Sequence, residues 1–185
     1  MQFTNSPSLQ MVQPKDKDLT WRNSIIERYG TKMAAIATHL KDLMTRKEKV
    51  KVIVFSQYDN ILAALTSLLQ EADPKNFNKQ IVTCRGNIHQ KMKTLEAFNS
   101  NSHESPRILL LSLTHSASGT HLAVATHIVL VDPVVGSKEE AQATDAQAIA
   151  RAHRLGQSNP VIAMRFIVEN SIDQLDYEQT YGTSE

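Results

Sequence analysis

The sequence predicts an α/β fold in which a mostly parallel sheet is covered by helices on both faces. Five short segments are apolar through their middle and rich in β-branched residues, as buried parallel strands are. Helical patterns separate these segments, and such an alternation favours a parallel sheet. Ligands of these sheets collect at the carboxyl ends of the strands, so the turns after the strands are the first candidates for a site. The predicted strands cover residues 50–55, 80–84, 107–113, 125–133 and 161–168.

Residues 1–20 are predicted to precede the folded domain, which would then cover residues 21–185. They are polar, contain two prolines and end in a charged run, as a linker or a poorly ordered arm does. The first helix of the domain is expected from Thr31 to about Arg46, because apolar residues recur there at helical spacing. This stripe consists of Met33, Ile36, Ala37, Leu40, Leu43 and Met44.

Apolar spacing also predicts the two helices that follow. Leucines at helical spacing mark a second helix, which Asp73 and Pro74 should end. In the next helix, Met92, Leu95 and Phe98 are expected to form the buried edge.

The last third of the chain is predicted to hold a loop before its remaining helices. Residues 136–144 are polar and charged, and we expect them to form that loop. Ser171 and Gln174 have the spacing of a capping box, in which each side chain bonds a backbone N–H of the helix start. This pair therefore predicts where the final helix begins.

Composition restricts the class of protein. The chain has 185 residues, which suits one domain, and its 41% of hydrophobic residues suffices for a core. The 20 basic residues balance the 19 acidic ones, so any contact with nucleic acid must come from local patches. Cys84 is the only cysteine, which excludes internal disulfides and cysteine-rich zinc sites. The histidines lack ligand spacing, so we expect no metal site, and no apolar run reaches the roughly 20 residues that a membrane span needs.

The most informative stretch runs from Gln147 to Gln157 and reads Gln-Ala-Ile-Ala-Arg-Ala-His-Arg-Leu-Gly-Gln. On a helix, Gln147, Arg151 and Arg154 would share one face, and Gly156 stands where a helix stop is expected. The planar guanidinium of arginine fits phosphate oxygens two at a time. Two arginines alone more often form a solvated basic helix end, which the helix dipole favours. The longer string decides between these interpretations.

This string resembles motif six of the Swi/Snf-type ATPases, a branch of helicase superfamily two. About residues 31–179 are similar to the second RecA-like lobe of those enzymes, and the resemblance implies a RecA-like three-layer sandwich. It also implies that Arg151 and Arg154 are catalytic and act as fingers on the γ-phosphate of ATP. Gln147 and Gly119 would belong to the same nucleotide site.

Two further segments resemble the motifs of this family that approach the DNA backbone. Residues 51–57, Lys-Val-Ile-Val-Phe-Ser-Gln, resemble motif four, although a plain turn with Ser56 as a helix cap is the alternative. Residues 114–122 match motif five in position and length but keep only Gly119 and Leu122 of its usual identities. The resemblance implies DNA contacts at Ser56, Gln57, Gly86, Asn87, Ser112, Thr114 and Ser116.

Within the family, the chain looks most like the SHPRH branch. The features that carry this are Ala-Thr-His-Ile-Val-Leu-Val-Asp-Pro at 125–133, the altered motif five and a short segment from Gly86 to Phe98. Members of that branch join a Swi/Snf-type ATPase to a RING ubiquitin ligase. The resemblance implies a nuclear protein with double-stranded DNA or chromatin as partner, and ubiquitin machinery reached through a RING outside this chain.

The chain lacks half of the expected active site. It contains no Gly-x-x-x-x-Gly-Lys-Ser/Thr loop and no Asp-Glu box after a strand. ATP and Mg²⁺ would therefore be bound mainly by a first RecA-like lobe, and this chain alone should be inactive. The whole protein is expected to be an ATP-dependent DNA helicase or translocase. Arg165, on the last predicted strand, is taken as the control arginine outside the motif.

Two other functions remain open. A RecA-like lobe can persist as a non-catalytic docking module, and the altered motif five fits that role. A pure docking lobe, however, has no need of both Arg151 and Arg154. A flavodoxin-like ligand-binding domain fits the alternation of strands and helices but leaves residues 147–157 unexplained.

Overall fold

A five-stranded parallel sheet with the order β2-β3-β1-β4-β5 forms the centre of the molecule. The structure, a computed structural model, describes residues 16–45, 50–113, 122–152 and 160–182. Every strand pairing in this part of the chain is parallel, which confirms the predicted sheet and its predicted strands. The strands are β1 (Val52–Ser56), β2 (Ile81–Thr83), β3 (Ile108–Ser112), β4 (His127–Leu130) and β5 (Ile162–Arg165).

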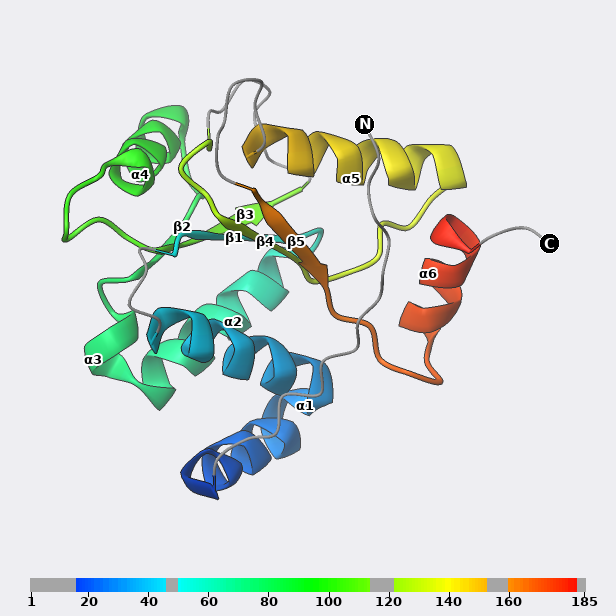
Figure 1. The fold of residues 1–185 in the computed structure, drawn as a ribbon, viewed down its shortest axis with the longest axis horizontal. Coiled ribbons are helices and arrows are strands. Elements are labelled where there is room, and N and C mark those ends of the chain that lie inside the picture. Colours follow the sequence, from blue (N-terminus) through cyan, green and yellow to red (C-terminus); the bar gives the residue numbers. More distant parts are fainter. Residues whose placement is uncertain (1–15, 46–49, 114–121, 153–159, 183–185) are drawn as a thin grey trace.

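Helices cover both faces of this sheet and complete three layers. The helices are α1 (Asp16–Thr45), α2 (Asp59–Ala72), α3 (Pro74–Phe77), α4 (Ile88–Asn99), α5 (Lys138–Ala152) and α6 (Ile172–Tyr181). Figure 1 shows α1 and α2 on one face and α4 and α5 on the other, with α6 beside α5. The predicted three-layer α/β architecture is therefore confirmed.

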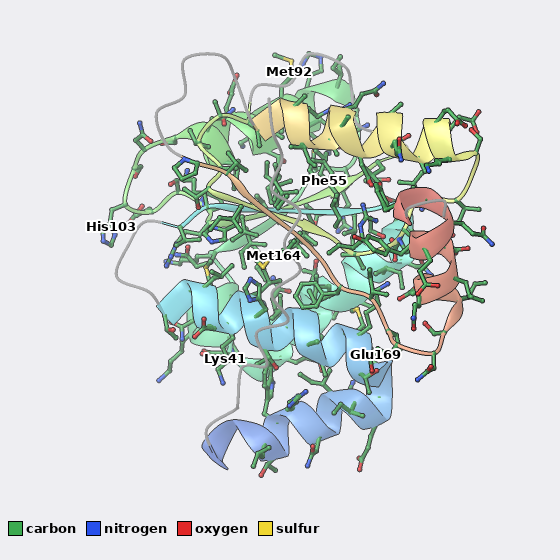
Figure 2. The ribbon with its side chains drawn as sticks, turned by 45° about the vertical axis from the view of Figure 1, so that its right-hand side comes forward. Lys41, Phe55, Met92, His103, Met164 and Glu169 are labelled. Atoms are coloured by element: carbon green, nitrogen blue, oxygen red, sulfur yellow. The ribbon has the colours of Figure 1, made fainter. Side chains whose placement is uncertain are left out.

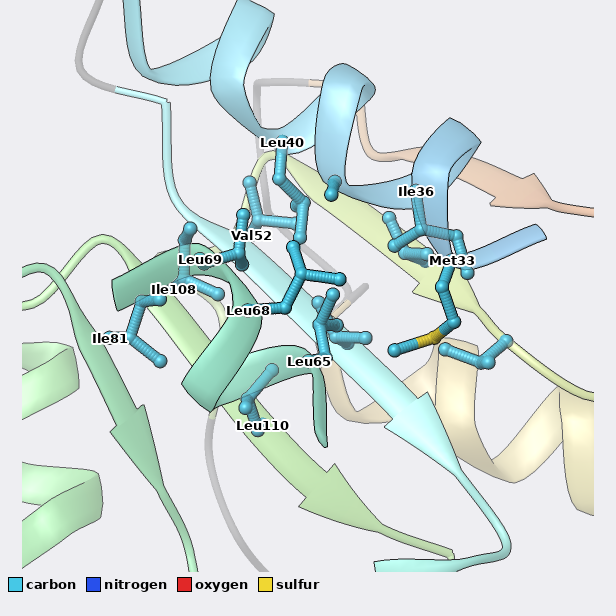
Figure 3. Close-up of a cluster of buried hydrophobic side chains, with 14 of the residues drawn as sticks. Met33, Ile36, Leu40, Val52, Leu65, Leu68, Leu69, Ile81, Ile108 and Leu110 are labelled. Atoms are coloured by element: carbon cyan, nitrogen blue, oxygen red, sulfur yellow. The ribbon is translucent and has the colours of Figure 1, made fainter. Parts of the chain in front are cut away.

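Successive side chains of β1 point to opposite faces of the sheet, and both faces are covered, which explains why its apolar run is continuous. Val52 and Val54 pack into the core under α1 and α2, which Figure 3 shows around Val52. Ile53 and Phe55 point to the opposite face and pack with residues of α4 and α5, where Phe55 is visible in Figure 2. Both faces are buried, so residues 52–55 are all apolar, and only the last residue of the strand, Ser56, is polar. Burial of this kind is the main source of stability for the sheet.

The first helix is longer than predicted, and part of the expected linker belongs to it. α1 begins at Asp16, and residues 1–15 lie outside the described part of the chain. Gly30 interrupts the helix with φ 84° and ψ 170°, a backbone conformation that glycine tolerates best. The part that follows begins near Thr31, as predicted. Its apolar stripe packs on the sheet, with Met44 half-buried and the other five residues buried.

The predicted loop at residues 136–144 is wrong, because α5 begins at Lys138. Ser137 and Glu140 form a reciprocal capping pair: the Glu140 N–H donates to Ser137 Oγ (3.2 Å), and the Ser137 N–H donates to Glu140 Oε2 (3.1 Å). The pair satisfies backbone donors that the first turn of a helix leaves open. In this charged segment, the Ser-x-x-Glu pattern is the sequence feature that could have predicted the start of α5.

Two predictions about the remaining helices also need correction. Met92 is 53% exposed, because α4 packs against the short edge strand β2 and buries mainly its last turn at Phe98. The final helix starts at the predicted place, but without the predicted capping box. The hydroxyl of Ser171 donates to the Val168 carbonyl (2.6 Å), and Gln174 Oε1 accepts from the Asn170 N–H (2.7 Å).

Candidate functional site

The carboxyl edge of the sheet gathers most of the predicted site residues that the structure describes. Strand register places Ser56 of β1 opposite Ser112 of β3, and Leu130 of β4 opposite Arg165 of β5. Asp132 follows β4 at the same edge. This arrangement follows from parallel pairing, because all strands then end on one side.

A polar network ties the turn after β1 to the turn after β4. The Ser56 hydroxyl donates to Asp132 Oδ2, and the Gln57 N–H donates to the same oxygen (3.3 Å). Gln57 Nε2 donates to the carbonyl of Pro133 (2.6 Å), and the Tyr58 N–H donates to Ser56 Oγ (3.0 Å). The backbone of residues 56–58 is therefore held in one conformation against the β4 turn.

Burial separates the predicted DNA contacts at this edge into two groups. Ser56 is 0% exposed and Ser112 is buried as well, so both side chains face the interior. Ser56 thus shapes the turn through Asp132, and it is not the N-cap of α2, a position that Tyr58 holds. Gln57 is half-buried, so solvent reaches this predicted contact, as it reaches the exposed Tyr58 that follows.

α5 carries the first part of motif six along one face of the sheet, from the carboxyl ends of the strands toward the start of β5 (Figure 1). Gln147 is exposed and Arg151 is half-buried, so the helix expected for these two residues is present. Burial lowers the pKa of Arg151, yet a guanidinium is basic enough to stay charged at neutral pH. The Arg151 carbonyl accepts from the Leu122 N–H (3.2 Å), which joins the end of the motif-five segment to this helix. Arg154 lies outside the described residues.

Arg165, chosen from the sequence as a control outside the motif, lies at this edge and contacts residues of two other elements. Its guanidinium forms an ion pair with Asp145 of α5, and its NH1 donates to the Asp132 carbonyl (3.0 Å). The side chains are 10% and 8% exposed, respectively. Burial raises the pKa of Asp145, while Arg165 lowers it through its charge and its hydrogen bond. The Tyr181 ring of α6 lies 5.3 Å from the guanidinium carbon and closes the site.

The Gly86–Asn87 loop has a structural role that its sequence did not reveal. Asn87 caps α4: its side chain accepts from the Gln90 N–H, and Gln90 Oε1 accepts from the Asn87 N–H, both at 3.0 Å. Gly86 has φ +92°, a conformation that other residues adopt with strain, and a Cβ there would lie 2.0 Å from Gln90 Oε1 and displace that cap. Both loop residues are exposed, as are the cations Arg85 and Lys93 nearby, which the sequence interpretation missed.

Three predicted site residues of the motif-five segment cannot be placed. Thr114, Ser116 and Gly119 lie outside the described ranges. The flanks of the segment are defined. The Leu113 N–H donates to the Ser56 carbonyl (2.9 Å), and Leu122 is buried under α5.

Metal ligands, membrane-spanning helices and the environment of Cys84 can each be examined in the described ranges. They contain no group of three or more His, Cys, Asp or Glu side chains that could hold a metal ion. No helix within them is both long enough and apolar enough to cross a membrane. Cys84 is buried, and burial raises the pKa of its thiol, which suits the expected role as core filler.

Comparison with known proteins places this geometry in context. The model of the helicase conserved C-terminal domain matches residues 32–156. DNA repair protein RAD5 of Candida albicans is 37% identical over 79% of this chain and 13% of its own length. E3 ubiquitin-protein ligase SHPRH of Mus musculus is 30% identical over 79% of the chain and 8% of its own length. Human helicase-like transcription factor is 30% identical over 86% of the chain and 14% of its own length.

A solved structure supports the fold independently. The C-terminal part of the Fun30 ATPase domain superposes with a TM-score of 0.67 and 19% identity, covering 94% of this chain and 49% of that one. This likeness concerns the fold alone. The chain spans only 8% to 14% of the length of the three relatives above, so it corresponds to one part of each.

Proposed function

This chain belongs to the helicase conserved C-terminal domain family, and on that premise we propose that it is the second RecA-like lobe of an ATP-dependent DNA translocase. The observation that carries the proposal is the position of α5. This helix begins at the carboxyl edge of the sheet and runs back antiparallel to the strands (Figure 1), which brings the motif-six residue Arg151 beside Leu122 at the end of the motif-five segment; the Leu122 N–H donates to the Arg151 carbonyl (3.2 Å). We expect the facing lobe of the whole protein to meet the surface where these two motifs adjoin.

In this proposal, Arg151 and Arg154 are the arginine fingers. ATP and Mg²⁺ are bound mainly by the first lobe, because this sequence has no phosphate-binding loop. A half-buried guanidinium is less screened by water, so it stabilises charge on a transferring phosphoryl group more strongly. Gln147, exposed four residues earlier on the helix, is proposed to contact the same nucleotide, as is Gly119.

DNA contact is proposed at two turns of the sheet edge. Gln57 is accessible in the turn after β1, and Gly86 and Asn87 are accessible before α4. Exposed Arg85 and Lys93 add local positive charge beside the second turn, which a nearly neutral chain needs in order to bind phosphates. Such contacts position the backbone and carry no sequence information, so we expect salt-sensitive binding without sequence preference.

The wider setting of the lobe is also a proposal. Among its relatives is a protein named as an E3 ubiquitin-protein ligase, and others are named as DNA repair proteins. We therefore propose a nuclear protein that acts on double-stranded DNA or chromatin, with ubiquitin machinery recruited through a RING outside this chain. A non-catalytic docking lobe is the competing function, and exposed Ile172 and Leu175 on α6 are the surface feature that favours it.

The test is the turnover of finger variants in the whole protein with saturating DNA. Arg151→Ala and Arg154→Ala should each slow turnover by about 10³-fold, since fingers elsewhere contribute on the order of 10³ to 10⁵. The affinity for ATP should change far less, because the first lobe does most of the binding. Arg154→Lys should rescue little, because an ammonium lacks the planar fork.

Arg28→Ala is the matched control. Arg28 pairs with Glu71 on the surface of α1 and α2, with side chains 61% and 57% exposed, so its loss should leave turnover unchanged. Wild-type turnover in both finger variants would instead support the docking lobe.

A further inference from the structure

Asp145 is the one polar residue among the buried positions of α5. The others are Ala141, Ala148 and Ala152. Alanine surfaces are smooth, and they specify the axial position of a helix weakly compared with interlocking large side chains. Apart from the half-buried Ile149, only alanines and Asp145 fix the register of α5 on the sheet, so the Asp145 contact carries much of it.

Arg165 supplies that contact from the end of β5. Its guanidinium bonds Asp145 of α5 on one side and the Asp132 carbonyl on the other (3.0 Å), so one planar group fixes the helix relative to the sheet. A fork that holds two partners at fixed angles restricts sliding and rotation more than a point charge does. Both side chains of the ion pair are buried, so water does not replace these bonds easily.

The anchor on the sheet is itself rigid. While the Asp132 backbone accepts from Arg165, its carboxylate accepts from the Ser56 hydroxyl and the Gln57 N–H. The same residue thus holds the turn proposed to contact DNA and the guanidinium that holds α5. Arg151 follows Asp145 by six residues on one continuous helix, about 9 Å along the axis.

We propose that Arg165 is a positioning residue, which sets the location of Arg151 through Asp145 and the register of α5. This inference rests on the proposed function, because it assumes that Arg151 acts on nucleotide. A small displacement of a catalytic group lowers the rate of the chemical step while leaving substrate binding nearly intact. Loss of Arg165 should have that signature.

The experiment measures turnover and KM for ATP in the whole protein with saturating DNA. Arg165→Met keeps the aliphatic stem and removes the fork, and it should lower kcat about tenfold to a hundredfold with KM for ATP within about twofold. Asp145→Asn, which keeps the shape of the side chain, should lower kcat in the same way by about threefold to tenfold. It also covers the case in which Arg165→Met fails to fold.

A double-variant cycle separates positioning from a merely structural role. If Arg165 acts through Arg151, adding Arg165→Met to Arg151→Ala should lower kcat by less than about twofold further. Multiplicative effects of the two changes would overturn the inference, as would wild-type kcat in a folded Asp145→Asn protein.

Arg107→Met is the matched control for loss of a buried guanidinium. Arg107 bonds the carbonyls of Val50 (3.1 Å) and Met44 (3.1 Å) at the opposite, amino edge of the sheet. This variant should lose stability but keep its kcat, and an equal fall in kcat would contradict the assignment of Arg165. If Arg151→Ala alone leaves kcat unchanged, the proposed function has failed, and that result is distinct from a failure of Arg165→Met alone.

Discussion

At the scale of single residues, burial decides what a charged or polar side chain does. Ser56 was predicted to approach DNA, but its hydroxyl is turned inward to Asp132. Arg165 lies outside motif six, yet it pairs with Asp145 from another element. Asp145 lies two residues before Gln147 in the sequence, close to motif six. The sequence does not show that its carboxylate points toward β5 in the folded chain. Partners brought together by tertiary packing are therefore the part of the site that sequence patterns could not supply.

The buried ion pair predicts a pH dependence of stability. Burial raises the pKa of Asp145, and Arg165 partly opposes this, so Arg165→Met should raise that pKa further. A raised folded-state pKa means that the fold favours the protonated carboxyl, so the contribution is present in acid and lost as pH rises through that pKa. Arg165→Met should thus cost about 3–5 kcal/mol of unfolding free energy near neutral pH and clearly less near pH 4.

Urea unfolding of wild type and variant at the two pH values measures this difference. The control is Arg165→Met made in the Asp145→Asn protein. Neither of these two proteins has a carboxyl at position 145, so the loss caused by Arg165→Met should be the same at both pH values. A loss in Arg165→Met that is equal at both pH values would show that the charge of Asp145 is not the cause.

At the scale of elements, the sheet was predictable and the helix ends were less so. The three central strands, β1, β3 and β4, are buried on both faces, and a continuous apolar run predicts that directly, whereas the edge strand β5 is partly exposed. The start of α5 was missed because its first turn is charged and exposed, so no apolar period marks it. α1 begins earlier than expected for a similar reason, since Asp16 to Asp18 form a charged run. Capping pairs, not apolar spacing, define such ends.

The α5 cap gives a prediction at this scale. Ser137→Ala removes the acceptor for the Glu140 N–H and should lower the unfolding free energy of the chain by about 1 kcal/mol. Ser137→Asp is the matched control, because aspartate keeps an acceptor at the N-cap, and its loss should be smaller. Chemical unfolding of both variants checks this. Equal losses would mean that the Ser137 hydroxyl is not a stabilising cap.

At the scale of the whole molecule, the turns proposed to contact DNA and the helix end proposed to contact nucleotide lie on different parts of the lobe. The turn at Gln57 follows β1 and Asn87 precedes α4 at the carboxyl edge of the sheet, whereas α5 runs back from that edge and brings Arg151 beside Leu122. This edge was predictable because parallel strands end together, and motif six was predictable because its residues are local in sequence. The Asp132–Arg165–Asp145 links between these parts join residues far apart in the chain, so they appear only in the fold.

The most direct test of the central claim compares ground-state and transition-state affinity in the whole protein. A finger acts on charge that develops during phosphoryl transfer, so it should favour a transition-state mimic over ATP itself. The measurement is the affinity for ADP with aluminium fluoride and for a non-hydrolysable ATP analogue, with DNA bound, in wild type and Arg151→Ala. We predict that the variant loses at least about a hundredfold in affinity for the mimic and less than about threefold for the analogue. Equal losses for both ligands, or no loss for either, would contradict the role of Arg151 as a finger.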